Sequence, residues 1–166
     1  MAGPRQAAHD GEGERLDDVR ILVVEARYYT DIADTLLAGA VRAIESAGAR
    51  HDVITVPGAL EIPTALAIAL DGAEAQGEPY DAAVALGCVV RGDTIHFEIV
   101  SEQSARGVMD VSLATNIPIG NGILTVNNDA QATIRASLTD GDKGGEAARA
   151  ALTLLRLARR YAAVTP

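Results

Sequence analysis

The sequence of 166 residues has one cysteine, no tryptophan and only five aromatic residues. Because Cys88 is alone, a disulfide within the chain is excluded, and we expect a reducing, cytoplasmic environment. Cys88 lies inside the apolar run 82–90, so we interpret it as a packed small hydrophobe rather than a reactive thiol. The three histidines are far apart and no Cys/His cluster has zinc spacing, so we expect no metal.

Positive charge and long apolar segments are also scarce. Lys and Arg number 14 against 23 Asp and Glu, a formal net charge of −9, which argues against nucleic-acid binding because phosphate contacts need a basic face. The longest apolar run, 82–90, is far shorter than the ~20 residues that span a bilayer. The first residues lack the apolar core of a signal peptide. We therefore expect a cytoplasmic protein that binds neither nucleic acid nor membranes.

Apolar residues make up 48% of the chain, enough for one sizeable core. At about 150 residues per domain, the length predicts a single domain. Residues 1–18 are polar and are expected to form a flexible tail, because they cannot bury enough surface to offset their ordering entropy. Residues 19–163 are expected to form the domain.

Within that domain, strand and helix patterns alternate. β-branched and apolar runs predict strands over 19–25, 52–56, 81–90 and 118–126. Apolar residues at helical spacing predict helices over 30–47, 59–75, 94–114, 129–138 and 144–163. This order is typical of an α/β fold: one three-layer, flavodoxin-like domain with a four-stranded parallel sheet and helices on both faces. Such sheets bind ligands beyond the carboxyl ends of their strands.

Two of the predicted strand ends carry residues suited to binding. Tyr28 and Tyr29 follow the first strand, where they either stack a flat heterocycle or only pack locally. Glu61 follows the second strand, after Pro57 and Gly58. It is either a helix-start carboxylate that complements the helix dipole or an acceptor for ligand hydroxyls. The prolines around it stiffen the segment, which lowers the ordering cost of binding.

The third strand leads through a glycine-containing loop into a predicted helix. Such an arrangement is a site for an anion, bound by backbone N–H groups and the helix dipole. Asp93 or Thr94 is suited to cap the helix. His96 then falls in the first turn, where it is either structural or an acid–base group that works near neutral pH. The loop is not a Walker motif, because no Gly-Lys-Ser/Thr follows.

The fourth strand contains Gly120 and Gly122, which suggests that a ligand or another backbone lies close by. Arg135 follows on the next helix. As a fixed cation it either completes a phosphate site or is a solvated surface charge.

Four segments together resemble the 6,7-dimethyl-8-ribityllumazine synthase family. They are VPGALEIP (56–63), GCVVRGDTIHFEIV (87–100), IPIGNGILTVNNDAQATIRA (117–136) and DKGGEAARAAL (142–152). The resemblance covers about residues 19–163. It implies a transferase of riboflavin biosynthesis that joins 5-amino-6-(D-ribitylamino)uracil to 3,4-dihydroxy-2-butanone 4-phosphate, with loss of phosphate and water. No metal or organic cofactor is implied.

The resemblance also implies a role for each matched residue. His96 corresponds to the proton-transfer histidine. Substrate-binding positions correspond to Tyr28 for the pyrimidine ring, Ala59, Leu60 and Glu61 for the ribityl chain, Cys88, Val89 and Val90 for the ring edge, and Asn121 for a wall. Phosphate-binding positions correspond to Asp93, Thr94 and Arg135. The wall position comes from a neighbouring subunit in the family, so the implied site lies between protomers of a homo-oligomer.

The chain departs from many members at two places: Tyr28 stands for Phe or Trp, and Asn121 stands for Phe. The family forms pentamers, some of which assemble into icosahedral capsids, and the short link 137–143 is compatible with a capsid. The alternative function is a weakly active or inactive shell that binds lumazine or flavin, or that serves as an assembly scaffold.

Overall fold

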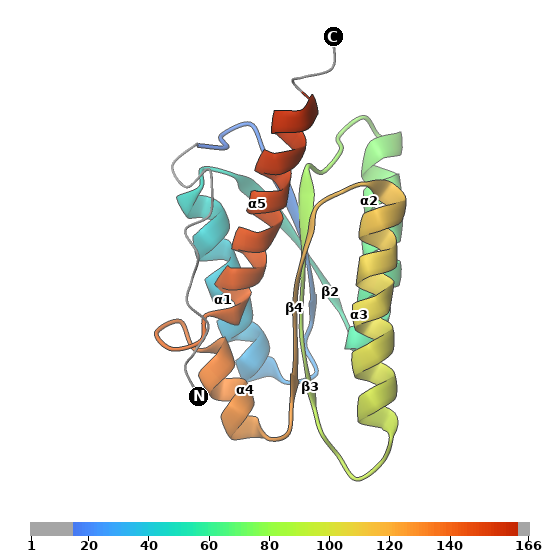
Figure 1. The fold of residues 1–166 in the computed structure, drawn as a ribbon, viewed down its shortest axis with the longest axis vertical. Helices are drawn as coiled ribbons and strands as arrows, with labels where there is room; N and C mark the ends of the chain where they lie inside the picture. The colour runs from blue at the N-terminus through green and yellow to red at the C-terminus, as the bar shows by residue number, and fades with distance from the viewer. Residues whose placement is uncertain (1–14, 163–166) are drawn as a thin grey trace.

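A computed structural model describes residues 15–162 of the chain (Figure 1). The elements in order are β1 (Arg20–Ala26), α1 (Thr30–Ser46), β2 (Arg50–Val56), the 3-10 turn η1 (Ala59–Glu61), α2 (Ile62–Ala75), β3 (Ala82–Val90), α3 (His96–Thr115), β4 (Ile119–Val126), α4 (Asp129–Ala136) and α5 (Lys143–Ala162). None of the helices in this part of the chain is long and apolar enough to cross a membrane.

The four strands form one parallel sheet in the order β2-β1-β3-β4. Helices α1, α4 and α5 cover one face, and α2 and α3 cover the other (Figure 1). The predicted three-layer α/β fold is therefore confirmed. The connection after β1 leads to β2 on one side of β1, and the connection after β2 leads to β3 on the other side of β1. The direction in which strands are added to the sheet therefore reverses between β1 and β3. A ligand crevice is expected beyond the carboxyl ends of these two strands.

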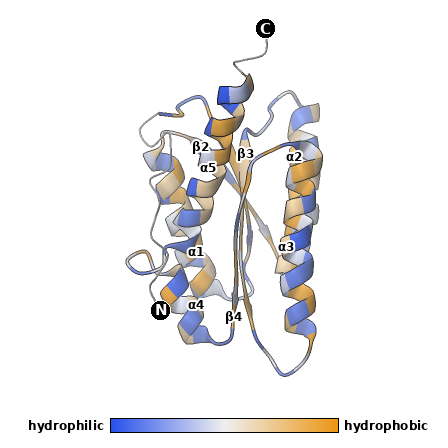
Figure 2. Cartoon of the chain, viewed as in Figure 1, coloured by the Kyte–Doolittle hydropathy of each residue, from blue (hydrophilic) through white to orange (hydrophobic). Residues whose placement is uncertain are grey.

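The central strands are apolar on both faces because helices cover them on both sides. On β1, Ile21 and Val23 pack toward α1 and α5, whereas Leu22 and Val24 pack toward α2. The helices carry both hydrophobic and hydrophilic residues along their length (Figure 2), as expected of helices with one covered face.

The two glycines of β4 let α5 approach the sheet. A Cβ on Gly120 would lie 1.9 Å from the backbone oxygen of Ala147, and a Cβ on Gly122 would lie 3.0 Å from the Ala147 side chain. Of the two readings that the sequence left open here, the structure supports the close approach of another backbone.

The packed chain begins before the predicted boundary between residues 18 and 19. Leu16 is fully buried in the core under α1 and α5, and its N–H donates to the Ala47 oxygen at 2.8 Å. Burial of this one large apolar side chain holds the segment on the domain. The rest of the predicted tail, residues 1–14, and residues 163–166 lie outside the described part of the chain.

Several element ends differ from the prediction by one to three residues. The helix expected from residue 59 starts as the 3-10 turn η1 and becomes α-helical at Ile62. The helix expected from residue 94 begins at His96. Helix α4 ends at Ala136 rather than 138, where the N–H of Ser137 donates to the Thr133 oxygen and the chain turns away.

A candidate active site at the carboxyl ends of the strands

A pocket of about 510 Å³ lies where β1, β2 and β3 end and α3 begins. Three separate segments of the chain contribute to it, 28–29, 57–61 and 88–100. Its lining residues are Tyr28, Tyr29, Pro57, Gly58, Ala59, Leu60, Glu61, Cys88, Val89, Val90, Gly92, Thr94, His96, Phe97 and Val100. The pocket therefore occupies the crevice that the strand order predicts.

The two tyrosines after β1 have different surroundings. Tyr28 is 76% exposed at the pocket, whereas Tyr29 packs partly against the core. Their ring centroids are 5.0 Å apart in an edge-to-face arrangement. Burial raises the pKa of the Tyr29 hydroxyl, so this group stays protonated near neutral pH. Tyr29 thus supports the Tyr28 ring, whose exposed face is available to a planar ligand.

An ion-pair network holds the turn that carries these tyrosines. The Glu25 carboxylate is only 3% exposed and accepts hydrogen bonds from Arg27 at 3.0 and 3.1 Å and from Thr55 at 3.0 Å. Arg27 also pairs with Asp34 on α1. Because a buried carboxylate is costly unless it is paired, these contacts favour one conformation of the turn.

Glu61 ends the 3-10 turn that follows β2, and its carboxylate is exposed at the pocket. The N–H of Glu61 donates to the Gly58 oxygen at 3.2 Å. A Cβ on Gly58 would lie 3.0 Å from Oε2 of Glu61. The missing side chain at Gly58 therefore leaves room for the carboxylate, which can accept hydrogen bonds from ligand hydroxyls.

The last residues of β3 present one backbone edge to the pocket. The ladder between β3 and β1 ends at Leu86, whereas the ladder between β3 and β4 continues to Val90. Residues 88–90 therefore keep the strand geometry without a β1 partner, and their backbone groups on that side are available to hydrogen-bond a ligand ring.

Cys88 lies within this edge, and burial raises the pKa of its thiol to about 11. The thiol is therefore protonated near neutral pH and unreactive. The side chain is 9% exposed and packs in the core with α1 and α5, which confirms the interpretation of Cys88 as a packed small side chain.

His96 is the first residue of α3 and lines the pocket beside Thr94 and Gly92. Its N–H donates to Oγ1 of Thr94 at 3.3 Å. The expected capping role is only partly met, because the residue before the helix is Ile95 and no side chain caps the helix there. The unpaired N–H groups of a first helical turn favour an anion beside the histidine. Asp93 belongs to the same loop but does not line the pocket.

Two of the predicted site residues lie apart from this pocket. Asn121 is exposed on the edge strand β4, and its Oδ1 accepts from the N–H of Ile123 at 3.0 Å. Arg135 is exposed on α4, in the opposite helix layer from α3, and donates to the Gln131 oxygen at 3.2 Å. The chain thus brings Tyr28, Ala59, Leu60, Glu61, Cys88, Val89, Val90, Thr94 and His96 together, but not Asp93, Asn121 or Arg135.

Six lining residues were not predicted as site residues: Tyr29, Pro57, Gly58, Gly92, Phe97 and Val100. The first four lie in the segments that follow the strands, where the parallel sheet already predicts ligand binding. Val100 lies four residues after His96, so helical periodicity could have placed it on the same face, whereas Phe97 follows His96 directly and has no such signal. Within residues 15–162, no cluster of three metal-ligating side chains is present.

Comparison with known proteins shows which family the chain resembles. The family model for 6,7-dimethyl-8-ribityllumazine synthase matches residues 18–159. A protein of that name from Rhodopseudomonas palustris (strain BisA53) is 61% identical over 162 residues, covering 98% of this chain and 99% of the relative. One from Nitrobacter hamburgensis is 65% identical over 143 residues, covering 86% and 88%. Another from Agrobacterium fabrum is 60% identical over 140 residues, covering 84% and 95%.

Proposed function

The chain belongs to the 6,7-dimethyl-8-ribityllumazine synthase family, and we propose that the pocket beyond β1, β2 and β3 is its active site. The reaction joins 5-amino-6-(D-ribitylamino)uracil to 3,4-dihydroxy-2-butanone 4-phosphate and releases phosphate and water. One observation carries the assignment of the site: a single pocket gathers an aromatic ring, a carboxylate, a loop before a helix start and a histidine from separate segments. These groups match the parts of the two substrates.

The pyrimidine substrate fits the half of the pocket formed by β1, β2 and β3. Tyr28 stacks on the uracil ring, because its face is exposed at the pocket. The backbone edge at 88–90 pairs with the polar edge of the ring. Glu61 accepts hydrogen bonds from the ribityl hydroxyls, and Ala59 and Leu60 support the chain beside it.

The phosphorylated ketone fits the half formed by the β3–α3 loop. Its phosphate binds the backbone of Asp93 and Thr94 and the first turn of α3, where helix N–H groups favour negative charge. The amino group of the uracil attacks the ketone to give an imine with loss of one water, phosphate is then eliminated, and the ring closes with loss of a second water. His96 moves the protons of these steps, because the imidazole ring has one nitrogen that can donate a proton and one that can accept it. The remaining contribution is to hold the two substrates together.

We also propose that the site is completed by a second copy of the chain, in a pentamer that is compatible with a larger capsid. Arg135 and Asn121 do not line the pocket of their own chain. Helix α3 and the residue before it carry exposed apolar side chains, among them Ile95 and Leu113, each 74% exposed. A partner that covers this helix removes apolar surface from water and brings its own Arg135 and Asn121 to the pocket. A cytoplasmic location stays a prediction from the lone cysteine.

The activity is tested by turnover of the two substrates, followed by the absorbance of the lumazine product. The wild type is expected to be active. A wild type that binds the product but does not turn over would favour the shell or scaffold alternative instead.

The shared site is tested by mixing two inactive variants. In His96→Ala the pocket loses its proton-transfer group, and in Arg135→Ala the phosphate grip that the partner brings is lost. Mixed assemblies should regain activity, because some interfaces then pair a pocket that has a normal His96 with a partner that has a normal Arg135. Arg15→Ala, which removes an exposed arginine far from the pocket, serves as the matched control. A fully active monomer of 17.2 kDa in light scattering would contradict the shared site.

A further inference from the structure

Arg91 connects three elements around the β3–α3 loop. Its backbone N–H donates to the Val126 oxygen of β4 at 2.9 Å, and its Nε donates to Oδ1 of Asn127 at 3.1 Å. Its Nη1 pairs with the Glu98 carboxylate in the first turn of α3. Its guanidinium carbon lies 4.1 Å from the centroid of the Phe97 ring. One side chain thus ties the end of β3 to the end of β4 and to the start of α3.

These contacts bracket the loop of residues 92–95. Arg91 stands immediately before the loop, and its partners Phe97 and Glu98 stand immediately after His96. The loop is therefore closed at its base by an ion pair and by the stacked Phe97 ring, which also lines the pocket. Movement of either contact would displace the backbone N–H groups at the helix start and the His96 ring with them.

We propose that Arg91 is a positioning residue, which holds the anion-binding loop and His96 through Phe97 and Glu98 and does not itself bind the phosphate. This inference rests on the proposed function of the pocket. The planar guanidinium uses one edge for Asn127, another for Glu98 and its face for Phe97, an arrangement that a lysine cannot reproduce. Arg91 does not line the pocket, whereas Phe97 does.

The protonation of Glu98 agrees with this role. The hydrogen bond from Arg91 lowers the pKa of the Glu98 carboxyl below its ordinary value of 4.5. The ion pair therefore persists across the neutral range, where His96 is proposed to act.

Glu98→Gln separates positioning from direct binding, because the two roles predict opposite results. If Arg91 acts by positioning, loss of the ion pair loosens the loop and weakens phosphate binding. Both partners are partly exposed, at 44% and 43%, so the expected loss is modest, about two- to fivefold. If Arg91 binds the phosphate directly, release from Glu98 frees its charge and strengthens phosphate binding.

The measurements are calorimetric titration with inorganic phosphate and steady-state kinetics on the assembled protein. Arg91→Lys and Glu98→Gln should both weaken phosphate binding and raise the KM for the phosphorylated ketone, with little change in the KM for the ribitylaminouracil. The double variant should lose less than the product of the two single losses, because one contact is removed in both. Since phosphate titration needs no turnover, an inactive wild type would refute the proposed function without deciding this inference.

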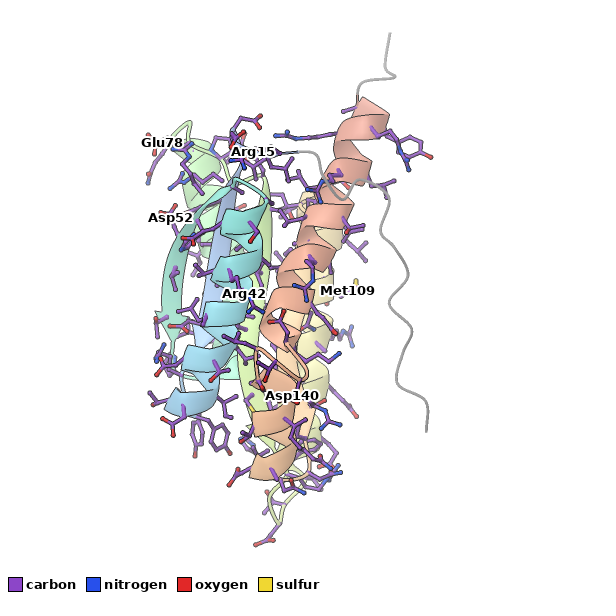
Figure 3. All side chains as sticks on the ribbon, turned by 90° about the vertical axis from the view of Figure 1, so that its left-hand side faces the viewer. Arg15, Arg42, Asp52, Glu78, Met109 and Asp140 are labelled. Carbon is purple, nitrogen blue, oxygen red and sulfur yellow. The ribbon has the colours of Figure 1, made fainter. Side chains whose placement is uncertain are left out.

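Asp17→Asn is the matched control, because it neutralises a carboxylate paired with an arginine at the opposite end of the molecule (Arg15 in Figure 3). It should leave phosphate binding unchanged. Tighter phosphate binding by Glu98→Gln would overturn the proposal in favour of direct contact. Unchanged binding in both test variants, or a lower unfolding midpoint of Glu98→Gln with unchanged binding, would also overturn it.

Discussion

Gly120→Ala adds one methyl group where the backbone of β4 lies directly against α5. The new Cβ would lie 1.9 Å from the backbone oxygen and 2.7 Å from the backbone carbon of Ala147. Real Cβ contacts essentially never fall below 3.0 Å, so α5 or β4 must move by about 1 Å. Neither atom belongs to a side chain that can rotate away. Overpacking that shifts the backbone costs about 1–3 kcal/mol, and we expect a loss of unfolding free energy at the upper end of that range.

Gly72→Ala makes the same chemical change at a site that has room for it. Gly72 lies within α2, and a Cβ there would meet nothing within 4 Å. Alanine is a better helix former than glycine and reduces the entropy of the unfolded chain, so we expect a gain of about 0.4–1 kcal/mol. The two substitutions should therefore change stability in opposite directions.

Urea unfolding followed by circular dichroism measures both effects. The two variants and the wild type are compared at one protein concentration, because assembly contributes to apparent stability. A change in midpoint at constant m-value reports stability alone. A Gly120→Ala variant as stable as the wild type, or as stable as Gly72→Ala, would refute the argument that α5 packs directly against the β4 backbone.

Three further predictions concern the pocket. Tyr28→Ala should weaken binding of the ribitylaminouracil by about 5- to 150-fold in a calorimetric titration, the range expected for loss of one stacked ring. It should cost little stability, because Tyr28 is 76% exposed. Tyr28→Phe should bind almost as the wild type does, and equal weakening in both variants would contradict stacking. Cys88 should react with iodoacetamide at pH 8 more than ~100-fold more slowly than a free thiol, because a pKa of about 11 leaves little thiolate. Its rate should rise as pH increases toward 11, and rapid labelling at pH 8 would contradict its burial. His96→Ala should lower turnover by up to ~10²–10⁴-fold without loss of assembly, and the matched His51→Ala variant should stay active. Unchanged turnover of His96→Ala at every pH would exclude proton transfer by this residue.

Local patterns in the sequence were enough to predict the elements and much of the pocket. The buried runs of β1 and β3, and the helical spacing in 30–47, follow from the repeat of apolar residues along one segment. The segment 87–96 joins a strand, a loop and a helix start, so the placement of Thr94 and His96 beside one another needs no distant contact. Parallel strands bring their carboxyl ends to one edge of a sheet, and this topological rule predicted that Tyr28 and Glu61 would meet there.

Contacts between distant segments were decided only by the tertiary structure. Leu16 lies in a polar stretch, and only the core under α1 and α5 shows why it is buried. The spacing of Gly120 could not distinguish a ligand from a helix, until α5 was found against it. Arg135 follows the site motifs along the chain, yet α4 carries it into the opposite helix layer from His96. Periodicity records which face of an element is apolar, whereas the choice of what covers that face depends on burial summed over all the elements together.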